Sequence, residues 1–148
     1  MQSKLLAENG PLRTYAIILE TGEEAMSVLE KFAQQEQLTA AQFTAIGAFS
    51  EALLSYFDWE RKEYLQIPVQ EQVEVAAFSG DVALGPDGTP ALHVHAVLGR
   101  SDGSALAGHL TRAHVRPTLE IMLTESPAHL RKRHDPESGL ALIRMDAR

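Results

Sequence analysis

The sequence predicts an α+β fold in which a mainly antiparallel sheet carries one main helix packed on a face. Three observations support this prediction. Segments rich in β-branched and aromatic residues follow one another through most of the 148-residue chain. Short turns rich in Gly, Asp, Pro and Ser separate them, and short turns join antiparallel neighbours because parallel strands need a long crossover. One segment near the N-terminus carries an apolar stripe at helical spacing instead, so one helix is expected to cover the sheet.

The composition is that of a globular domain and excludes several functions. Hydrophobic residues make up 45% and charged residues 22% of the chain, and its length fits a single domain over residues 1–148. The absence of cysteine excludes disulfides, thiolate metal sites and a cysteine nucleophile. A net charge of -7 argues against nucleic acid as the main partner. Without a signal peptide or an apolar run of the ~20 residues that a membrane span needs, a cytoplasmic protein with no membrane partner is expected.

The first predicted elements are a strand and a helix. Residues 12–19 are rich in β-branched and aromatic residues and predict the strand. Thr21 is the predicted helix N-cap, with Glu24 three residues later completing a capping box. The apolar stripe that follows predicts a helix to about Gln37 that packs on the core. The stripe consists of Ala25, Leu29, Phe32 and Ala33, broadened by Met26 and Val28.

Strands are predicted through the rest of the chain. Gly47 is expected to separate the first two of them, and Gly80 to mark a bulge in a later one. Turns are predicted at residues 60–62, 85–88 and 101–104, and a helical turn at 127–134. The last strand is expected to close the sheet; the predicted strands cover residues 43–46, 51–59, 64–69, 73–84, 91–98, 105–110, 118–124 and 140–145.

A group of histidines is the most informative feature of the sequence. Side chains alternate across a strand, so His93 and His95 point to one face of the predicted strand 91–98. If the next hairpin is centred on Asp102, His95 lies directly opposite His109, with Cβ atoms ~5 Å apart on the same face. Three imidazoles converging there can hold a divalent metal and leave a position open to water. The alternative is three histidines that align without binding anything.

The residues around these histidines resemble a known family. Residues 92–99 (LHVHAVLG), 107–110 (AGHL) and 115–120 (VRPTLE) resemble the signature blocks of the PPC (plant and prokaryote conserved) domain, found beside AT-hooks in plant DNA-binding proteins. Residues 43–48 (FTAIGA) resemble the family's strand that ends in Ile-Gly. The resemblance covers roughly residues 12–145.

The resemblance implies a fold, an assembly and a metal site. It implies a sheet-centred fold and a homotrimer, and it implies that bacterial members can hold a metal on histidines at the positions of His93, His95 and His109. The fold is similar to that of acetolactate decarboxylase, whose zinc sits on a His-x-His pair and a later histidine. Among the metals that imidazole and oxygen ligands suit, which include iron, nickel, manganese and copper, zinc is therefore the expected cofactor.

Other residues are weaker candidates. Glu120 is a candidate to orient a ligand imidazole or to act as a general acid/base, against the alternative of an ordinary exposed carboxylate. Thr118 shares its strand face by parity. His114, expected in a loop, is a candidate fourth ligand or a solvated histidine. The basic run at residues 131–133 is a candidate nucleic-acid contact, although a solvated face or a subunit contact explains it equally.

The sequence favours a homotrimeric metal-binding module of the PPC type. Bacterial members are conventionally labelled DNA-binding, but this chain is acidic and contains no Arg-Gly-Arg-Pro core of an AT-hook. The alternative is a metal-dependent enzyme acting on a small carbonyl or carboxylate compound, with Glu120 as the proton carrier. The sequence leaves open whether the protein is an enzyme. Because pockets favour interfaces, the site is expected at a boundary between subunits, where a small-molecule ligand can bind.

Overall fold

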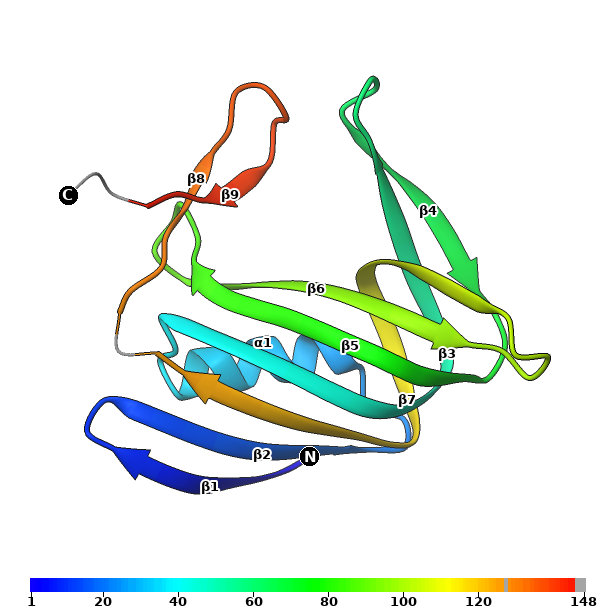
Figure 1. Ribbon diagram of the computed structural model, residues 1–148, viewed down its shortest axis with the longest axis horizontal. Helices are drawn as coiled ribbons and strands as arrows, with labels where there is room; N and C mark the ends of the chain where they lie inside the picture. Colours follow the sequence, from blue (N-terminus) through cyan, green and yellow to red (C-terminus); the bar gives the residue numbers. More distant parts are fainter. Residues whose placement is uncertain (127, 146–148) are drawn as a thin grey trace.

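A curved antiparallel sheet forms most of the protein, as the computed structural model shows for residues 1–126 and 128–145 (Figure 1). Its strand order is β1-β2-β7-β6-β5-β3-β4, and every pairing is antiparallel. The predicted fold class is confirmed. The elements of the described residues are β1 (Gln2–Asn9), β2 (Leu12–Glu20), α1 (Ala25–Gln35), β3 (Ala40–Asp58), β4 (Glu63–Val69), β5 (Val73–Leu84), β6 (Pro90–Gly99), β7 (Ala105–Glu125), β8 (Lys132–His134) and β9 (Ala141–Ile143).

The long strand β7 closes the sheet around the core. Its first residues pair with β6, its later ones pair with β2, and nearly its whole length pairs with β3. Phe49, Phe78 and Leu119 are fully buried inside this closure, and the predicted helical stripe joins the same core from α1. Burial of each such side chain stabilises the fold by about 1.5–3 kcal/mol. The opposite face of the sheet is left for the site.

The helix begins later than the capping box predicts. Glu24, not Thr21, is the N-cap, and its carboxylate accepts hydrogen bonds from the backbone N–H groups of Met26 and Ser27. The predicted N-cap at Thr21 is wrong because residues 21–23, ahead of the helix, are held against β7. There the N–H of Gly22 donates to the carbonyl of Val115. The helix ends at Gln35, two residues before the predicted end.

Two pairs of predicted strands are in fact two long strands. Residues 43–46 and 51–59 both belong to β3, because the register shift at Gly47 bends the strand without ending it. Residues 105–110 and 118–124 both belong to β7, so His114 lies in a strand and not in the predicted loop. The bulge of β5 lies at Ala76 and not at Gly80. Gly80 instead allows close packing, since a Cβ there would lie 2.5 Å from the ring of Phe43.

The two ends of the chain differ most from the prediction. Strand β1 was not predicted, because every residue in it is exposed and no alternation marks it. Residues 128–134 do not form the predicted helical turn, and β9 does not close the main sheet. Instead β8 and β9 pair with each other in a separate hairpin beside the ends of β5 and β6 (Figure 1). Pro127, at the start of the predicted helical turn, lies outside the described residues.

Backbone hydrogen bonds explain where this hairpin goes. The N–H of Leu84, at the end of β5, donates to the carbonyl of Leu130, which leads the chain past the sheet edge. The turn between the strands is closed by the Asp135 carboxylate, which accepts from the N–H and hydroxyl of Ser138. In the part of the chain that the structure describes, no helix has the length and apolar character to cross a membrane.

Candidate metal centre

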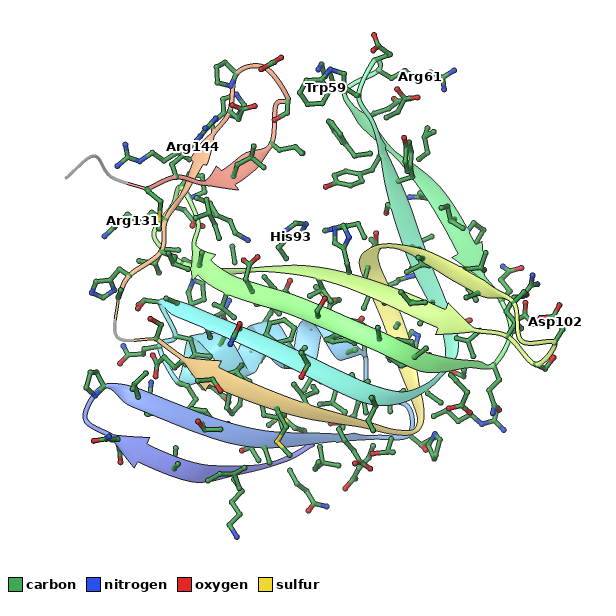
Figure 2. All side chains as sticks on the ribbon, in the orientation of Figure 1. Trp59, Arg61, His93, Asp102, Arg131 and Arg144 are labelled. Carbon is green, nitrogen blue, oxygen red and sulfur yellow. The ribbon has the colours of Figure 1, made fainter. Side chains whose placement is uncertain are left out.

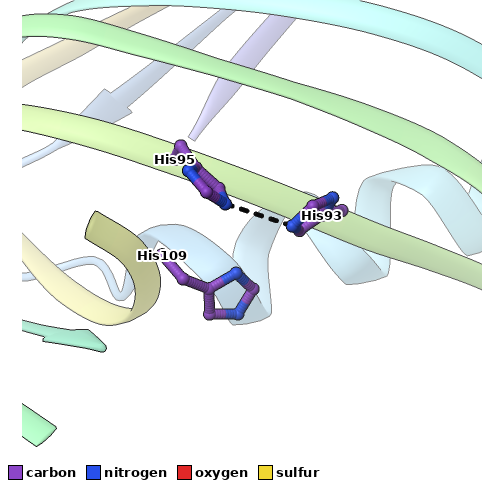
Figure 3. Close-up of side chains that lie close together, drawn as sticks. All are labelled: His93, His95 and His109. Carbon is purple, nitrogen blue, oxygen red and sulfur yellow. Dashed lines mark hydrogen bonds between the residues drawn. The ribbon is translucent and has the colours of Figure 1, made fainter. Parts of the chain in front are cut away.

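The three histidines converge on the outer face of the sheet, at the hairpin between β6 and β7 (Figure 3). His93 and His95 lie on β6, and His95 is directly opposite His109 on β7, as predicted. The connecting turn has the predicted centre, where the Asp102 carboxylate accepts hydrogen bonds from the N–H and hydroxyl of Ser104. The turn therefore fixes the register that brings His109 to the other two rings.

The spacing of the ring nitrogens fits a metal ion. Nε2 of His93 and Nε2 of His95 are 3.2 Å apart, and one nitrogen from each of the three histidines lies within 4.8 Å of the others. Two nitrogens bound at about 2.0–2.1 Å to a tetrahedral metal are about 3.3–3.4 Å apart. The His93–His95 pair therefore already has the separation of two ligands on one ion.

The electrostatics of the cluster also fit a metal ion. Burial lowers the pKa of His109 to about 4, with further lowering by the charges of His93, His95 and Lys132. Burial, followed by the charge of His93, also lowers the pKa of His95. Both rings are neutral at pH 7, so each has a nitrogen lone pair to donate. Within the described residues, the buried Nδ1 of His109 has no hydrogen-bond partner, and such an orphaned atom in a polar cluster fits a missing ligand.

Asp81 contacts the cluster and was not predicted from the sequence. It lies opposite His93 on β5, with its Oδ2 atom 3.8 Å from Nδ1 of His93 and its Oδ1 atom 3.4 Å from Nζ of Lys132. Burial raises the pKa of Asp81, but the neighbouring His93 and Lys132 outweigh it and hold the pKa below its ordinary value. A carboxylate beside a histidine ligand orients the ring. The predicted turn at residues 85–88 is enough to find this contact, because a hairpin with that turn pairs Asp81 with His93.

The other candidate residues lie away from the cluster. Glu120 is exposed on β7, opposite Ile18 of β2 and Ile46 of β3, and its role in proton transfer stays a prediction. The hydroxyl of Thr118 donates to the carbonyl of Leu19. Nδ1 of His114 lies 3.2 Å from Oε1 of Glu51. Among the described residues, the cluster whose side chains are close enough to share a metal ion consists of His93, His95 and His109, without His114.

A cleft of about 370 Å³ opens beside the histidines. In Figure 2, His93 lies between the β8–β9 hairpin and the turn that joins β3 to β4, where Trp59 and Arg61 are labelled. From β4, the ring of Tyr64 stacks near that of His109, with centroids 5.0 Å apart, a contact that the sequence did not predict. The cleft is lined by Tyr64, Asp81, Ala91, Leu92, His93, His109, Lys132, Leu140, Ala141, Leu142 and Ile143.

This sequence is similar to known proteins over most of its length. The profile of the Plants and Prokaryotes Conserved (PCC) domain matches residues 6–127. A curated relative, the Bifunctional protein GlmU of Synechococcus sp. (strain JA-3-3Ab), is 34% identical over 133 residues. Those residues are 88% of this chain but 20% of the relative, so the chain spans about a fifth of that protein.

Solved structures share the fold. A PPC protein of Pyrococcus horikoshii is 30% identical, with a TM-score of 0.84 over 95% of this chain and 99% of its own. A metal-containing protein of Archaeoglobus fulgidus is 28% identical, with a TM-score of 0.83 over 98% and 99%. A Ralstonia eutropha protein, named for a proposed DNA-binding role, is 28% identical, with a TM-score of 0.82 over 89% and 91%.

The predicted kinship of fold with acetolactate decarboxylase is also found. A Staphylococcus aureus protein similar to that enzyme aligns with a TM-score of 0.54 over 75% of this chain and 51% of its own, at 12% identity, which shows the fold alone. The family profile covers far more than half of the 148 residues, in agreement with the sequence blocks around His93 and His109. This chain therefore belongs to the Plants and Prokaryotes Conserved (PCC) domain family, the PPC family.

Proposed function

We propose that this protein binds one divalent metal ion through His93, His95 and His109, and that the ion is zinc. The observation that carries the proposal is the convergence of three imidazoles, with a separation of 3.2 Å between the Nε2 atoms of His93 and His95. Neutral imidazoles are good zinc ligands, and three of them leave a fourth position open for water or a ligand. The Archaeoglobus fulgidus relative, named as metal-containing, supports the proposal.

The proposed assembly is a homotrimer. Its support in this chain is an exposed apolar area on the outer face of the sheet. Ile46 on β3 is 64% exposed and Met122 on the neighbouring strand β7 is 55% exposed. Apolar side chains gathered on neighbouring strands are typical of a surface that a second copy covers.

Direct DNA binding is not part of this proposal, although relatives carry that label. The net charge is -7, and a duplex-binding face needs clustered cations. The basic run at residues 131–133 does not present its charges together. The side chain of Lys132 is 8% exposed and lies beside Asp81. The charge distribution therefore favours metal binding over DNA binding as the function of this protein.

A second candidate function is that of a metal-dependent enzyme acting on a small carbonyl or carboxylate compound. The cleft favours it, because His93 and His109 line a space large enough for a small molecule. A bound dication would polarise a carbonyl or activate water there. The chain's own residues would orient the ligands through Asp81 and exclude bulk water through the apolar side of the cleft. Glu120 is the candidate proton carrier on β7, and Asp81 is the carboxylate in contact with the cluster.

Elemental analysis of the purified protein, combined with its native mass, tests the proposal. We expect one zinc per chain after expression in zinc-replete medium, and the mass of a trimer. Absence of stoichiometric metal under these conditions would refute the metal-binding proposal. A monomeric mass would refute the assembly but leave the metal site standing. A gel-shift titration at low salt that shows tight, salt-sensitive DNA binding would restore the DNA-binding hypothesis.

A further inference from the structure

The C-terminal hairpin forms one side of the cleft beside the histidines. The family profile ends at residue 127, so β8 and β9 lie beyond the part of the chain that it matches. The hairpin nevertheless supplies Lys132, Leu140, Ala141, Leu142 and Ile143 to the lining. A segment outside the family match therefore lines the cleft beside the three histidines.

Lys132 is the one cation in this lining. Its side chain is 8% exposed, and its Nζ atom donates to the carbonyl of Ala91 at 3.2 Å and lies 3.4 Å from Oδ1 of Asp81. A lysine is rarely buried to this extent unless it is paired. An ammonium has three N–H donors, and the carbonyl of Ala91 accepts from one of them, so donors remain for a ligand in the cleft.

The charge of the cleft depends on the metal. The ammonium of Lys132 and the carboxylate of Asp81 balance each other, and the three imidazoles of a metal site are neutral ligands. A bound dication adds two positive charges that neutral imidazole ligands do not offset. An anion is attracted only to the metal-loaded protein.

Apart from the hydroxyl of Tyr64, the remaining lining is apolar, which limits the class of anion. Leu92, Leu140, Leu142 and Ile143 form the walls around Lys132. A phosphate group is usually held by several N–H donors or an arginine, and the lining contains a single lysine. A carboxylate needs fewer donors, and an attached apolar group gains from contact with these walls.

We propose that the β8–β9 hairpin turns the three-histidine site into a binding pocket for a small carboxylate with an apolar body. The carboxylate binds at the metal and the Lys132 ammonium, and the body contacts Leu142 and Ile143. This inference rests on the proposed function, because the anion is attracted by the metal ion. It adds the class of ligand and the segment that selects it.

The test uses the full-length protein loaded with Co²⁺, whose visible spectrum reports on its ligands. The bound Co²⁺ per chain is measured first. Acetate, butyrate, hexanoate and inorganic phosphate are then titrated by calorimetry and by the visible spectrum. We expect binding only to the loaded protein, with the Kd falling about fourfold for each added CH₂ group that is buried, and phosphate binding more weakly than butyrate. Equal affinity for acetate and hexanoate, or tighter binding of phosphate, would overturn the inference.

Two variants assign the effect to the hairpin. Lys132→Met is expected to weaken acetate and hexanoate binding alike by about tenfold or more at unchanged Co²⁺ stoichiometry. Ile143→Thr keeps the β-branched shape and is expected to weaken hexanoate binding several-fold while acetate binding stays unchanged. Leu12→Thr, an exposed apolar residue on β2, is the matched control and is expected to change neither.

The outcomes separate this inference from the proposed function. A wild-type protein that takes up no Co²⁺ removes the metal site itself. Normal Co²⁺ uptake, with carboxylate affinities unchanged in the variants, overturns the hairpin pocket alone. If Lys132→Met fails to fold by circular dichroism, Ile143→Thr decides the question, because Ile143 is 36% exposed and its replacement leaves the core intact.

Discussion

His95 lies directly opposite His109 across the hairpin that joins β6 to β7, and the two rings are 5.6 Å apart between centroids. The pairing continues to the turn through Ala96 opposite Gly108. A Cβ at Gly108 would lie 2.8 Å from the carbonyl oxygen of Ser55, so only glycine lets β3 approach this close to the site. The register and this close approach together place three imidazoles at one point.

Replacing either paired histidine should weaken metal binding severely. His95→Ala and His109→Ala each remove one of three ligands. Loss of a residue that only orients a ligand already costs about 10–100-fold in metal affinity, so we expect loss of a ligand itself to lower the zinc affinity by more than about 100-fold. Competition with a chromophoric chelator measures the affinity. His114→Ala is the matched control, because His114 faces Glu51 outside the cluster. Equal loss in the control would show that the effect is not specific to the site.

Asp81→Asn should weaken the metal site without removing it. The amide keeps the shape of the side chain but loses the charge beside Nδ1 of His93, so the zinc affinity is expected to fall about 10–100-fold at unchanged stoichiometry. The same chelator competition measures it. Glu71→Gln removes an exposed carboxylate that pairs with Arg100, and it should leave the affinity unchanged. Wild-type affinity in Asp81→Asn would mean that His93 needs no carboxylate to orient it.

The sequence predicts the convergence of the three histidines better than it predicts the strands that carry them. The alternation of His93 and His95 and the turn centred on Asp102 are local signals, and both hold in the structure. The joining of residues 105–110 and 118–124 into β7 depends on pairing with β3, which is remote in sequence. A glycine such as Gly47 indicates an interruption, but local sequence does not distinguish a bulge from a break.

Residues that reach the site from distant segments are the hardest to predict. Tyr64 and Lys132 come from β4 and from the C-terminal hairpin, and neither carries a local signal of its contact. The basic run around Lys132 even indicates a solvated face, whereas the structure buries the middle residue beside Asp81. Such contacts follow from the closure of the whole sheet, and not from periodicity within one segment.

Removing the helix cap should lower stability in a pH-dependent way. Glu24 accepts hydrogen bonds from the N–H groups of Met26, Ser27 and Ala113, so Glu24→Ala should lower the free energy of unfolding by about 1–2 kcal/mol at pH 7. Ala113 ties this cap to β7. Urea denaturation of the wild type and the variant measures the difference.

The sign of the pH dependence follows from the pKa of Glu24. Burial raises this pKa, but the backbone hydrogen bonds outweigh burial and hold it below the ordinary value of 4.5. The folded state therefore binds fewer protons than the unfolded chain, and the stabilisation is complete above pH 4.5 and is lost as the pH falls through the folded pKa. The gap between wild type and Glu24→Ala should narrow in acid. A gap that stays constant from pH 7 to pH 3 would contradict this account.

A charge on the outer face should separate the subunits. Met122 is 55% exposed between Ala16 of β2 and Thr44 of β3, so Met122→Glu places a carboxylate in the middle of the proposed contact. We expect the mass by light scattering to change from trimer to monomer while the far-ultraviolet circular dichroism is unchanged. Leu12→Glu is the control, because Leu12 is exposed at the start of β2, opposite Asn9 of β1, and this variant should remain trimeric. A trimeric Met122→Glu would place the interface elsewhere.

Gly47→Ala should be among the most destabilising single substitutions in the chain. Gly47 has a φ of 153°, where side chains are rarely found, and an added Cβ would overlap the carbonyl oxygen of Thr118 and lie 2.9 Å from Cα of Leu119. Both neighbours are backbone atoms of β7, so relief requires that β3 and β7 move apart. Strain and overpacking together are expected to lower the free energy of unfolding by about 2–4 kcal/mol.

The matched control for this substitution is Gly99→Ala. A Cβ at Gly99 would lie 3.8 Å from the carbonyl oxygen of Glu74, an ordinary contact, so the change in stability should stay within about 0.5 kcal/mol. Denaturation midpoints of both variants give the comparison. Since β7 also carries His109, Gly47→Ala should further weaken zinc binding if the separation of β3 and β7 reaches the site. Normal zinc affinity with reduced stability would show that the hairpin holds the histidines independently of this contact.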